Sequence, residues 1–439
     1  MELAAIYLAN AAKHGALESD FPFLIDRLNR GSDSLMTVLV EKPYHFVPPH
    51  RGNLWPSFIQ RFRLVDWYLR KHDGVVSHEC RNLDRFRESI SSGNAILLAP
   101  NHCRYADPLA LGWPAREAGT HVHAIASWHL FAKSWLDAFS IQKMGGFSLF
   151  REGPDRQSLE TAIDILTHAR RPLIIFPEGT TNRTNDVLQP LLDGVAFIAR
   201  TAAKRRKKEC DGQVVVHPVG IKYLFKGNIH DWGGNAASDL ERRLGWRPRH
   251  GVDLVERIKS LAEALLATRE TLYLGSGQTG PLADRRNQLV EHLLSSAEAR
   301  FDLGAESSSN PLSRVRRLRS MISPMLQESS TRQRKEELYH LVDGIEFAQQ
   351  LYSYPDRYLL TTPVTDTQIL ETLERMQEGF IGKSTNPNPL HAVIEFGTAI
   401  AVNPDKTPKG EGDPLMLQIE SQLREMIGRL AREANVISS

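Results

Sequence analysis

The sequence contains little cysteine, no long apolar run and almost no excess of charge of either sign. Its 439 residues include three cysteines, an odd number, which argues against a disulfide framework and for a reducing compartment. No window approaches the ~18 apolar residues that a transmembrane helix requires. A formal net charge of +2 provides no overall attraction to nucleic acid or to a membrane. If the protein acts on lipid, we expect it to do so from a membrane surface.

The N-terminus also lacks the features of a secretory signal. The chain starts with Met1-Glu2, and no basic residue precedes the mildly apolar stretch 3–12. With 24% charged and 41% hydrophobic residues, the composition is that of an ordinary globular protein, and the length predicts about one to three domains. We therefore expect a cytoplasmic protein, peripheral at the cytoplasmic face of the membrane.

The pattern of apolar residues divides the chain into four parts. The first is mostly helical, and its segment 56–71 is the most amphipathic, with an apolar side fringed by basic residues. In the second part short apolar segments alternate with helical patterns, which is typical of an α/β sheet. The third is helical and polar, and the last contains a strand-like segment followed by a helix. The four parts are 1–92, 93–225, 226–389 and 390–439.

Within these parts the pattern predicts individual strands and helices. Strands are expected at 95–99, 122–126, 147–150, 173–176, 214–219 and 391–402. Helices are expected at 157–169, 193–207, 251–273, 282–302, 313–327, 332–352, 366–380 and 413–433.

The first candidate catalytic residues directly follow an expected strand. The segment Asn101 to Asp107 (NHCRYAD) comes after 95–99, and active sites of open α/β sheets gather at the carboxyl ends of strands. A turn can bring the Asp107 carboxylate onto one nitrogen of His102 and leave the other free to accept a proton from a substrate hydroxyl. The alternative is that Asp107 only caps a helix beginning at Pro108. Cys103 is expected to be an inert thiol.

Three further blocks end or follow expected strands. They are Gly145 to Arg151 (GGFSLFR), Phe176 to Arg183 (FPEGTTNR) and Val216 to Gly220 (VHPVG). If both strand ends face the histidine, the guanidinium groups of Arg151 and Arg183 converge there and could hold a phosphate group. The alternatives are a tight turn with a solvated glutamate, and an ion pair between Arg151 and a carboxylate such as Glu178.

In this order and spacing the four blocks resemble the glycerolipid acyltransferase family, typified by the 1-acylglycerol-3-phosphate O-acyltransferases. The resemblance covers about residues 90–225. It implies an α/β fold with a mixed, largely parallel sheet flanked by helices. The segment 393–402 is similar to the strand that closes the family domain, so 226–389 would be a long helical insertion within the catalytic domain.

The resemblance also implies roles for single residues. His102 would be the catalytic base and Asp107 the group that orients it, with no metal and no cofactor. The residues implied in acceptor binding are Arg151, Glu178, Gly179, Thr180 and Arg183. Two departures from the family pattern concern charge. A lysine often found in the family is absent near Ser127 to Phe131, with Lys133 or His129 as substitutes, and the arginine of the third block is displaced by two positions.

We therefore expect an O-acyltransferase of phospholipid biosynthesis. It would transfer a fatty acyl group from acyl-CoA or acyl carrier protein to the hydroxyl of a lysophosphatidic-acid-type glycerophospholipid. Its partners would be a lysophospholipid acceptor, an acyl-thioester donor and a membrane surface, but not nucleic acid. Alternatives are a glycerol-3-phosphate or other lysophospholipid acyltransferase, and a non-catalytic membrane-binding scaffold. A dinucleotide-dependent enzyme would require Gly275 to Gly280 (GSGQTG) to follow a strand, whereas the preceding pattern is helical.

Overall fold

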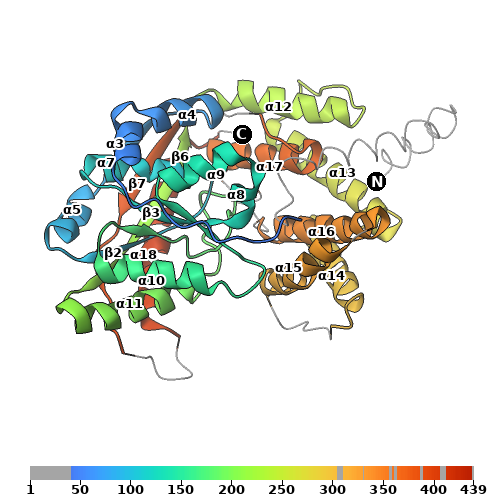
Figure 1. The fold of residues 1–439 in the computed structure, drawn as a ribbon. Coiled ribbons are helices and arrows are strands. Elements are labelled where there is room, and N and C mark those ends of the chain that lie inside the picture. Colours follow the sequence, from blue (N-terminus) through green and yellow to red (C-terminus); the bar gives the residue numbers. More distant parts are fainter. Residues whose placement is uncertain are drawn as a thin grey trace, which may run out of the picture.

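Within the part of the chain that the structure describes, eight strands form one sheet (Figure 1). The computed structural model describes residues 41–303, 310–329, 331–354, 358–359, 363–385, 389–405 and 412–437. The strand order is β1-β7-β6-β2-β5-β3-β4, with β8 also paired to β6. The strands are β1 (Val75–Arg81), β2 (Ala95–Pro100), β3 (His123–Ser127), β4 (Gly146–Leu149), β5 (Leu173–Ile174), β6 (Val214–Phe225), β7 (Leu390–Phe396) and β8 (Ile400–Ala401).

The predicted mixed, largely parallel sheet is confirmed. Every pair is parallel except β6 with β7 and β6 with β8. Parallel strands are usually covered on both faces, so they read as continuous apolar runs. All residues of β2 and β6 are buried, which explains why these strands were the plainest in the sequence. The expected strands at 95–99, 122–126, 147–150, 173–176 and 214–219 correspond to β2 to β6.

The N-terminal part departs from the mostly helical prediction for residues 1–92. It contains β1, an edge strand that, among the described residues, pairs with β7 alone. An edge strand needs no continuous apolar run, and the polar residues Ser77, His78 and Glu79 therefore hid the strand pattern. The amphipathic segment 56–71 forms two helices, α3 (Leu54–Arg61) and α4 (Leu64–His72), because Arg63 between them has a left-handed φ of 52°. Residues 1–40 of this predicted part lie outside the described residues.

The C-terminal segment completes the sheet beside β6. β7 runs antiparallel to the second half of β6, and β8 pairs with Val215 and Val216 near its start. The prediction that this segment joins the sheet is confirmed, although it forms two strands and not one. The chain turns between them at Gly397, where a side chain would come within 3.0 Å of the Pro218 carbonyl oxygen.

Helices cover both faces of the sheet. Alternate residues of β2 point to opposite sides: Ile96 and Leu98 pack in one cluster, and Leu97 packs in the other. Besides α3 and α4, the described helices outside the block 226–389 are α5 (Leu83–Ser91), α6 (Asp107–Ala110), α7 (Gly112–Glu117), α8 (Trp128–Lys133), α9 (Trp135–Lys143), α10 (Arg156–His168), α11 (Gly194–Cys210) and α18 (Pro414–Ala431). Helices α10, α11 and α18 pack with Leu97.

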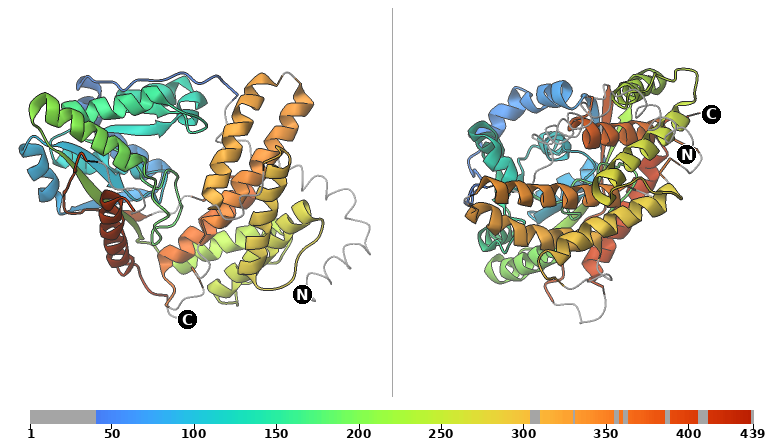
Figure 2. Two further views of the ribbon diagram at one scale, coloured as in Figure 1. Left: turned by 90° about the horizontal axis from the view of Figure 1, so that it is seen from below. Right: turned by 90° about the vertical axis from the view of Figure 1, so that its right-hand side faces the viewer.

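The block 226–389 is helical, as predicted, and gathers beside the sheet (Figures 1 and 2, yellow to orange). Its helices are α12 (Ile229–Arg243), α13 (Leu254–Leu274), α14 (Leu282–Ala299), α15 (Pro311–Glu328), α16 (Arg332–Tyr352) and α17 (Asp366–Ile381). Side chains of α12, α13 and α17 pack in the same cluster as Ile96. Helices α14 to α16 share a cluster of their own, which includes Leu294, Leu318 and Val342.

Among the described residues, no helix combines the length and the apolar character that crossing a membrane requires.

We predict that Ile394→Ala destabilises the protein strongly. Ile394 lies on β7 with no exposed surface, and its side chain packs against the face that carries Ile96. Truncating such a side chain leaves a cavity and should lower the free energy of unfolding by about 2–5 kcal/mol. Denaturant unfolding would measure it. Leu417→Ala, at an exposed position on α18, should change stability by less than about 0.5 kcal/mol. Equal effects of both substitutions would contradict a core role for β7.

Candidate active site

His102 and Asp107 meet at the carboxyl end of β2. Asn101 fixes the start of the loop, because its side chain donates to the Ile221 carbonyl (3.0 Å) and accepts from the Ile221 N–H (2.6 Å) on β6. The next residue, His102, lies with Nδ1 2.9 Å from Oδ2 of Asp107. The structure therefore brings together the two residues that the sequence paired, with one imidazole nitrogen bound to a carboxylate.

Asp107 is fully buried, and besides His102 and the Cys103 thiol two stronger donors contact its carboxylate. The Arg104 N–H donates to Oδ2 (2.9 Å), and the Tyr223 hydroxyl donates to Oδ1 (2.8 Å). Asp107 begins α6, yet its oxygens turn back toward the loop, which favours the orienting role over the capping one. A buried carboxylate needs such donors, and they also hold it in place for His102. Tyr223, on β6, was missed, because its pairing across 116 positions leaves no local signal.

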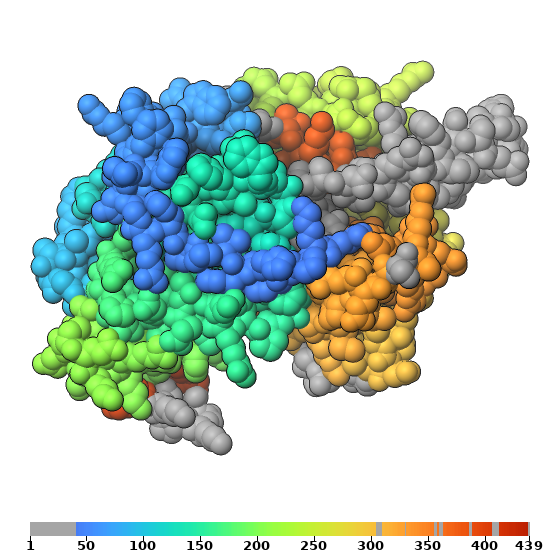
Figure 3. Space-filling model, in the orientation of Figure 1, coloured from blue at the N-terminus to red at the C-terminus, as the bar shows by residue number. Residues whose placement is uncertain are grey.

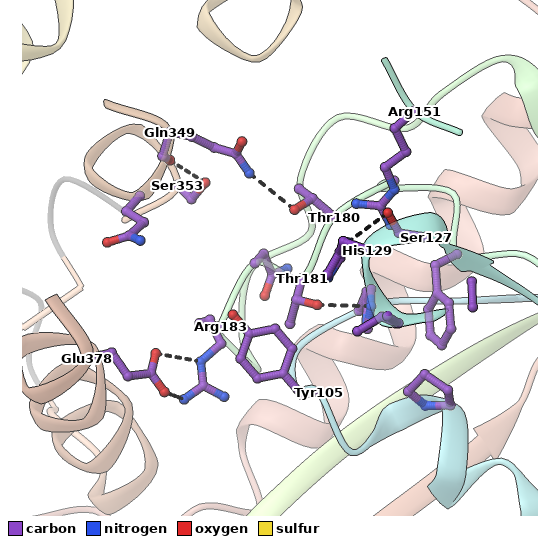
Figure 4. Close-up of a pocket in the computed structure, with 18 of the residues that line it drawn as sticks. Tyr105, Ser127, His129, Arg151, Thr180, Thr181, Arg183, Gln349, Ser353 and Glu378 are labelled. Carbon is purple, nitrogen blue, oxygen red and sulfur yellow. Dashed lines mark hydrogen bonds and ion pairs between the residues drawn. The ribbon is translucent and has the colours of Figure 1, made fainter. Parts of the chain in front are cut away.

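The other nitrogen of His102 faces a threonine hydroxyl. Thr181 Oγ1 lies 3.0 Å from His102 Nε2 (Figure 4), and the ring of Phe176 stacks on the imidazole at 4.0 Å between centroids. Thr181 was not predicted. Its hydroxyl marks where a substrate hydroxyl would have to lie for His102 to accept its proton.

The predicted acceptor-binding residue Glu178 lies behind the loop and has no exposed surface. Its carboxylate accepts hydrogen bonds from the backbone N–H groups of His102 (2.7 Å) and Gln189 (3.0 Å) and from the Asn182 side chain (2.7 Å). Burial raises the pKa of Glu178 to about 7, although these donors oppose the rise. The structure thus gives Glu178 a positioning role for the histidine backbone in place of the predicted contact with a ligand.

Gly179 and Thr180 do line the cavity in front of His102. Gly179 has φ +70°, and a side chain there would collide with Leu192, so both the backbone and the space demand glycine. Thr180 accepts a hydrogen bond from the side-chain amide of Gln349 on α16 at 3.1 Å (Figure 4).

The predicted convergence of Arg151 and Arg183 is not what the structure shows. Arg183 turns toward α17, where its guanidinium pairs with Glu378 and stacks over the ring of Tyr105 (Figure 4). Although burial disfavours its charge, Glu378 and Glu374 hold the pKa of Arg183 above its ordinary value. Its charge is thus already compensated within the protein. Arg151 lines the cavity, and among the described residues it has neither a hydrogen-bond nor an ion-pair partner.

Three glutamates of α17 hold the loops that carry the site. Glu374 pairs with Arg104 next to the histidine loop, Glu378 pairs with Arg183, and Glu371 accepts from the backbone of Asn185 at 2.9 Å. They occupy one face of the helix, at spacings of three and four. That spacing was a signal in the sequence, but it did not reveal the distant loops as partners.

A cavity of about 2000 Å³ opens in front of His102. It is larger than the ~300–1000 Å³ of most small-molecule sites. Its walls come from the sheet, from α4, α8 and α9, and from the helical block, and many of the lining side chains are apolar, among them Leu130, Ile198, Leu266, Phe347 and Met376. A space of this size and lining suits a long hydrocarbon chain.

The structure also places the remaining residues that the sequence analysis singled out. Burial raises the pKa of the Cys103 thiol far above its ordinary range, in keeping with an inert thiol. His129 and Lys133 both line the cavity, and burial, with the nearby Arg151 and Lys133, lowers the pKa of His129 to about 3, so this imidazole stays neutral. Gly275 ends α13 in a left-handed turn. The segment GSGQTG therefore follows a helix, which removes the basis for a dinucleotide fingerprint.

Glu178 predicts a pH dependence of stability. The unfolded chain loses this proton near pH 4.5, whereas the folded protein keeps it until about pH 7. Between these values a rise in pH favours unfolding, so the contribution of Glu178 is complete below pH 4.5 and is lost as pH rises through 7. The free energy of unfolding should fall by about 3 kcal/mol more in the wild type than in Glu178→Gln.

Thermal or urea unfolding between pH 4.5 and 8 would measure this difference. Glu88→Gln, at an exposed position on α5, should follow the wild-type curve. Parallel curves for the wild type and Glu178→Gln would contradict the assignment.

Comparison with known proteins identifies the part of the chain that carries this geometry. A family model described as Acyltransferase matches residues 78–222, from β1 to β6, and so includes His102, Asp107 and the Phe176 to Arg183 loop. The curated proteins include no match to the chain. Residues 78–222 therefore form an acyltransferase-family domain.

Proposed function

We propose that the protein is an O-acyltransferase that acylates the free hydroxyl of a lysophosphatidic-acid-type glycerophospholipid. The observation that carries the proposal is the position of the His102–Asp107 pair at the wall of a large, mostly apolar cavity within an acyltransferase-family domain. The donor would be an acyl-thioester, acyl-CoA or acyl carrier protein, because a thioester is already activated and requires no further cofactor.

The chemistry follows from the two nitrogens of His102. Asp107 fixes Nδ1, so Nε2 is the nitrogen that can accept a proton. As Nε2 takes the proton of the acceptor hydroxyl, the oxygen attacks the thioester carbonyl carbon and a new ester C–O bond forms. The C–S bond then breaks, and the leaving thiolate receives the proton from His102. The acyl chain would lie along the apolar walls of the cavity.

Support for an anionic acceptor comes from Arg151, whose guanidinium faces the cavity without a partner among the described residues. An unpaired arginine in a partly enclosed site favours a negatively charged group such as phosphate.

An acyl-transfer assay tests this function. Purified protein is incubated with acyl-CoA or acyl carrier protein and a mixture of lysophosphatidate, glycerol 3-phosphate and neutral monoacylglycerol, and products are measured by mass spectrometry. We expect acylated lysophosphatidate, and turnover about 10²–10⁴-fold lower for His102→Ala and Asp107→Asn in folded protein.

His168→Ala is the matched control, because this histidine is exposed on α10 and does not line the cavity. Near-normal turnover by folded His102→Ala would contradict the mechanism. Acylation of Thr181 by the donor alone would contradict direct transfer, since Thr181 lies next to His102.

We also propose that the protein meets its substrates at a lipid surface through α3, α4 and α9. Three exposed aromatic rings, Trp55, Phe58 and Phe62, form a strip along α3 and its C-terminal end, with Phe58 against Phe62 at 4.7 Å between centroids, and the half-buried Phe139 of α9 packs against Trp55. Figure 3 shows α3 and α4 (blue) at the surface. Phe62 is 62% exposed, and exposing an apolar ring of this size to water is unfavourable. Arg61 and Arg63 are exposed beside it.

The strip borders the cavity. Leu64, Tyr68 and Leu136 are exposed to solvent and also line the cavity that contains His102. A lipid-soluble acceptor could therefore pass from a membrane to the base without crossing water. Aromatic and cationic side chains together suit the interface of an anionic bilayer.

Vesicle binding would test this surface. The triple substitution Trp55→Ser, Phe58→Ser and Phe62→Ser should weaken binding to phosphatidylglycerol-containing vesicles at least about tenfold, because each ring contributes roughly 1.5–3 kcal/mol when buried. Leu417→Ser, an exposed apolar position on α18, should not change binding. Co-sedimentation provides the measurement, and unchanged binding by the triple variant would exclude this strip as the contact.

A further inference from the structure

Arg151 is not alone at the cavity. Two arginines of α15, Arg316 and Arg319, line the same cavity. They belong to the helical block and lie outside the acyltransferase-family domain. Arg316 has neither a hydrogen-bond nor an ion-pair partner among the described residues. The Arg319 side chain is 12% exposed, and its Nε is buried without a hydrogen-bond partner.

Two carboxylates, Glu346 and Glu152, lie near these three arginines, so they offset only part of the positive charge. Glu346 on α16 lies 3.6 Å from Arg319, at the long limit of an ion pair. Glu152 follows Arg151, and burial raises the pKa of this carboxyl, although the nearby Arg319 and Arg151 oppose the rise. Burial, together with the positive charges of Arg319 and Arg316, lowers the pKa of Arg151 to about 10. The three guanidinium groups therefore lie close enough to repel one another.

The position of Arg316 connects this charge to the base. Its Nη2 lies 3.9 Å from where a Cβ at Gly179 would be. Gly179 is two residues before Thr181, whose hydroxyl contacts His102 Nε2. The guanidinium thus packs over the turn that leads to the reacting position.

We propose that Arg151, Arg316 and Arg319 form one binding site for the phosphate group of the acyl acceptor, so that α15 supplies part of the substrate site. Three guanidinium groups beside two carboxylates leave an excess of positive charge that favours an anion, and each guanidinium can donate two hydrogen bonds to phosphate oxygens. The site takes the role that the sequence gave to Arg151 and Arg183. This inference rests on the proposed function, because it identifies what the acceptor must carry.

The acceptor suits the site better than the donor. In a glycerophosphate the phosphate is only a few bonds from the hydroxyl, which matches an anion site beside the Gly179 turn. In acyl-CoA or acyl carrier protein a whole pantetheine arm separates the nearest phosphate from the thioester carbon. A phosphate held next to His102 would fix the hydroxyl near Nε2 and so act by positioning.

The test compares Arg316→Gln and Arg319→Gln with Arg317→Gln in the full-length protein. Arg317 is on the same helix but does not line the cavity, so its substitution removes the same charge elsewhere. We expect the KM for lysophosphatidate to rise about 10- to 100-fold in the first two variants, with kcat little changed. The KM for neutral monoacylglycerol and all constants of Arg317→Gln should stay near the wild-type values.

A comparison of two donors separates the possible sources of the phosphate. The donor arm compares acyl-CoA with S-acyl-pantetheine, which has no phosphate. A loss confined to acyl-CoA would overturn the assignment to the acceptor, and an equal loss for lysophosphatidate and monoacylglycerol would overturn the anion site itself.

Calorimetric binding of inorganic phosphate needs no turnover. Phosphate binding that depends on Arg316 would support the anion site even if no hydroxyl acceptor were acylated, in which case only the proposed function would fail. Phosphate binding that is unchanged in both variants would overturn the inference even if acyl transfer were observed.

Discussion

Three glutamates on one face of α17 bind the helical block to the loops of the acyltransferase-family domain. Glu374 and Glu378 meet the guanidinium groups of Arg104 and Arg183, and all four side chains are largely removed from water. Burying such charges is favourable only in pairs, and removal of one partner from a buried pair typically costs about 3–5 kcal/mol. Removing either side chain of a pair would therefore leave the other charge buried and unpaired, so the contact between the block 226–389 and the loops depends on both partners. The shape of the cavity depends on this constraint.

Because the ion pairs hold the helical block against the loops, side chains from two parts of the chain line the same cavity. The sheet supplies the His102–Asp107 pair, whereas α15 and α16 supply Arg316, Arg319 and the Gln349 amide that binds Thr180. The acyltransferase-family domain provides the His102–Asp107 pair, and the helical block forms the facing wall of the cavity. Differences in substrate between proteins that share the domain could then arise from the wall without any change at this pair.

Local patterns in the sequence predicted what depends on neighbouring residues. The buried strand β2 and the turn from His102 to Asp107 lie within a few positions of one another, so their apolar run and spacing were readable. Interactions between residues that are far apart in the sequence could not be predicted in this way. Tyr223 binds Asp107 across 116 positions, and Arg183 reaches Glu378 across 195, which removed it from the predicted phosphate site. β1 was missed because an edge strand needs no continuous apolar run.

The pairing of β1 with β7 has a consequence for biosynthesis. Ser77 and His391 are neighbours on these strands although 314 positions separate them. During synthesis, β1 must wait until the residues up to β7, 314 positions further along from Ser77 to His391, have left the ribosome. Contacts of such long range form slowly, and unpaired strand edges attract other chains in the meantime. The nascent protein would therefore be most vulnerable to aggregation until β7 emerges, and chaperones that shield strand edges would have most effect during that interval.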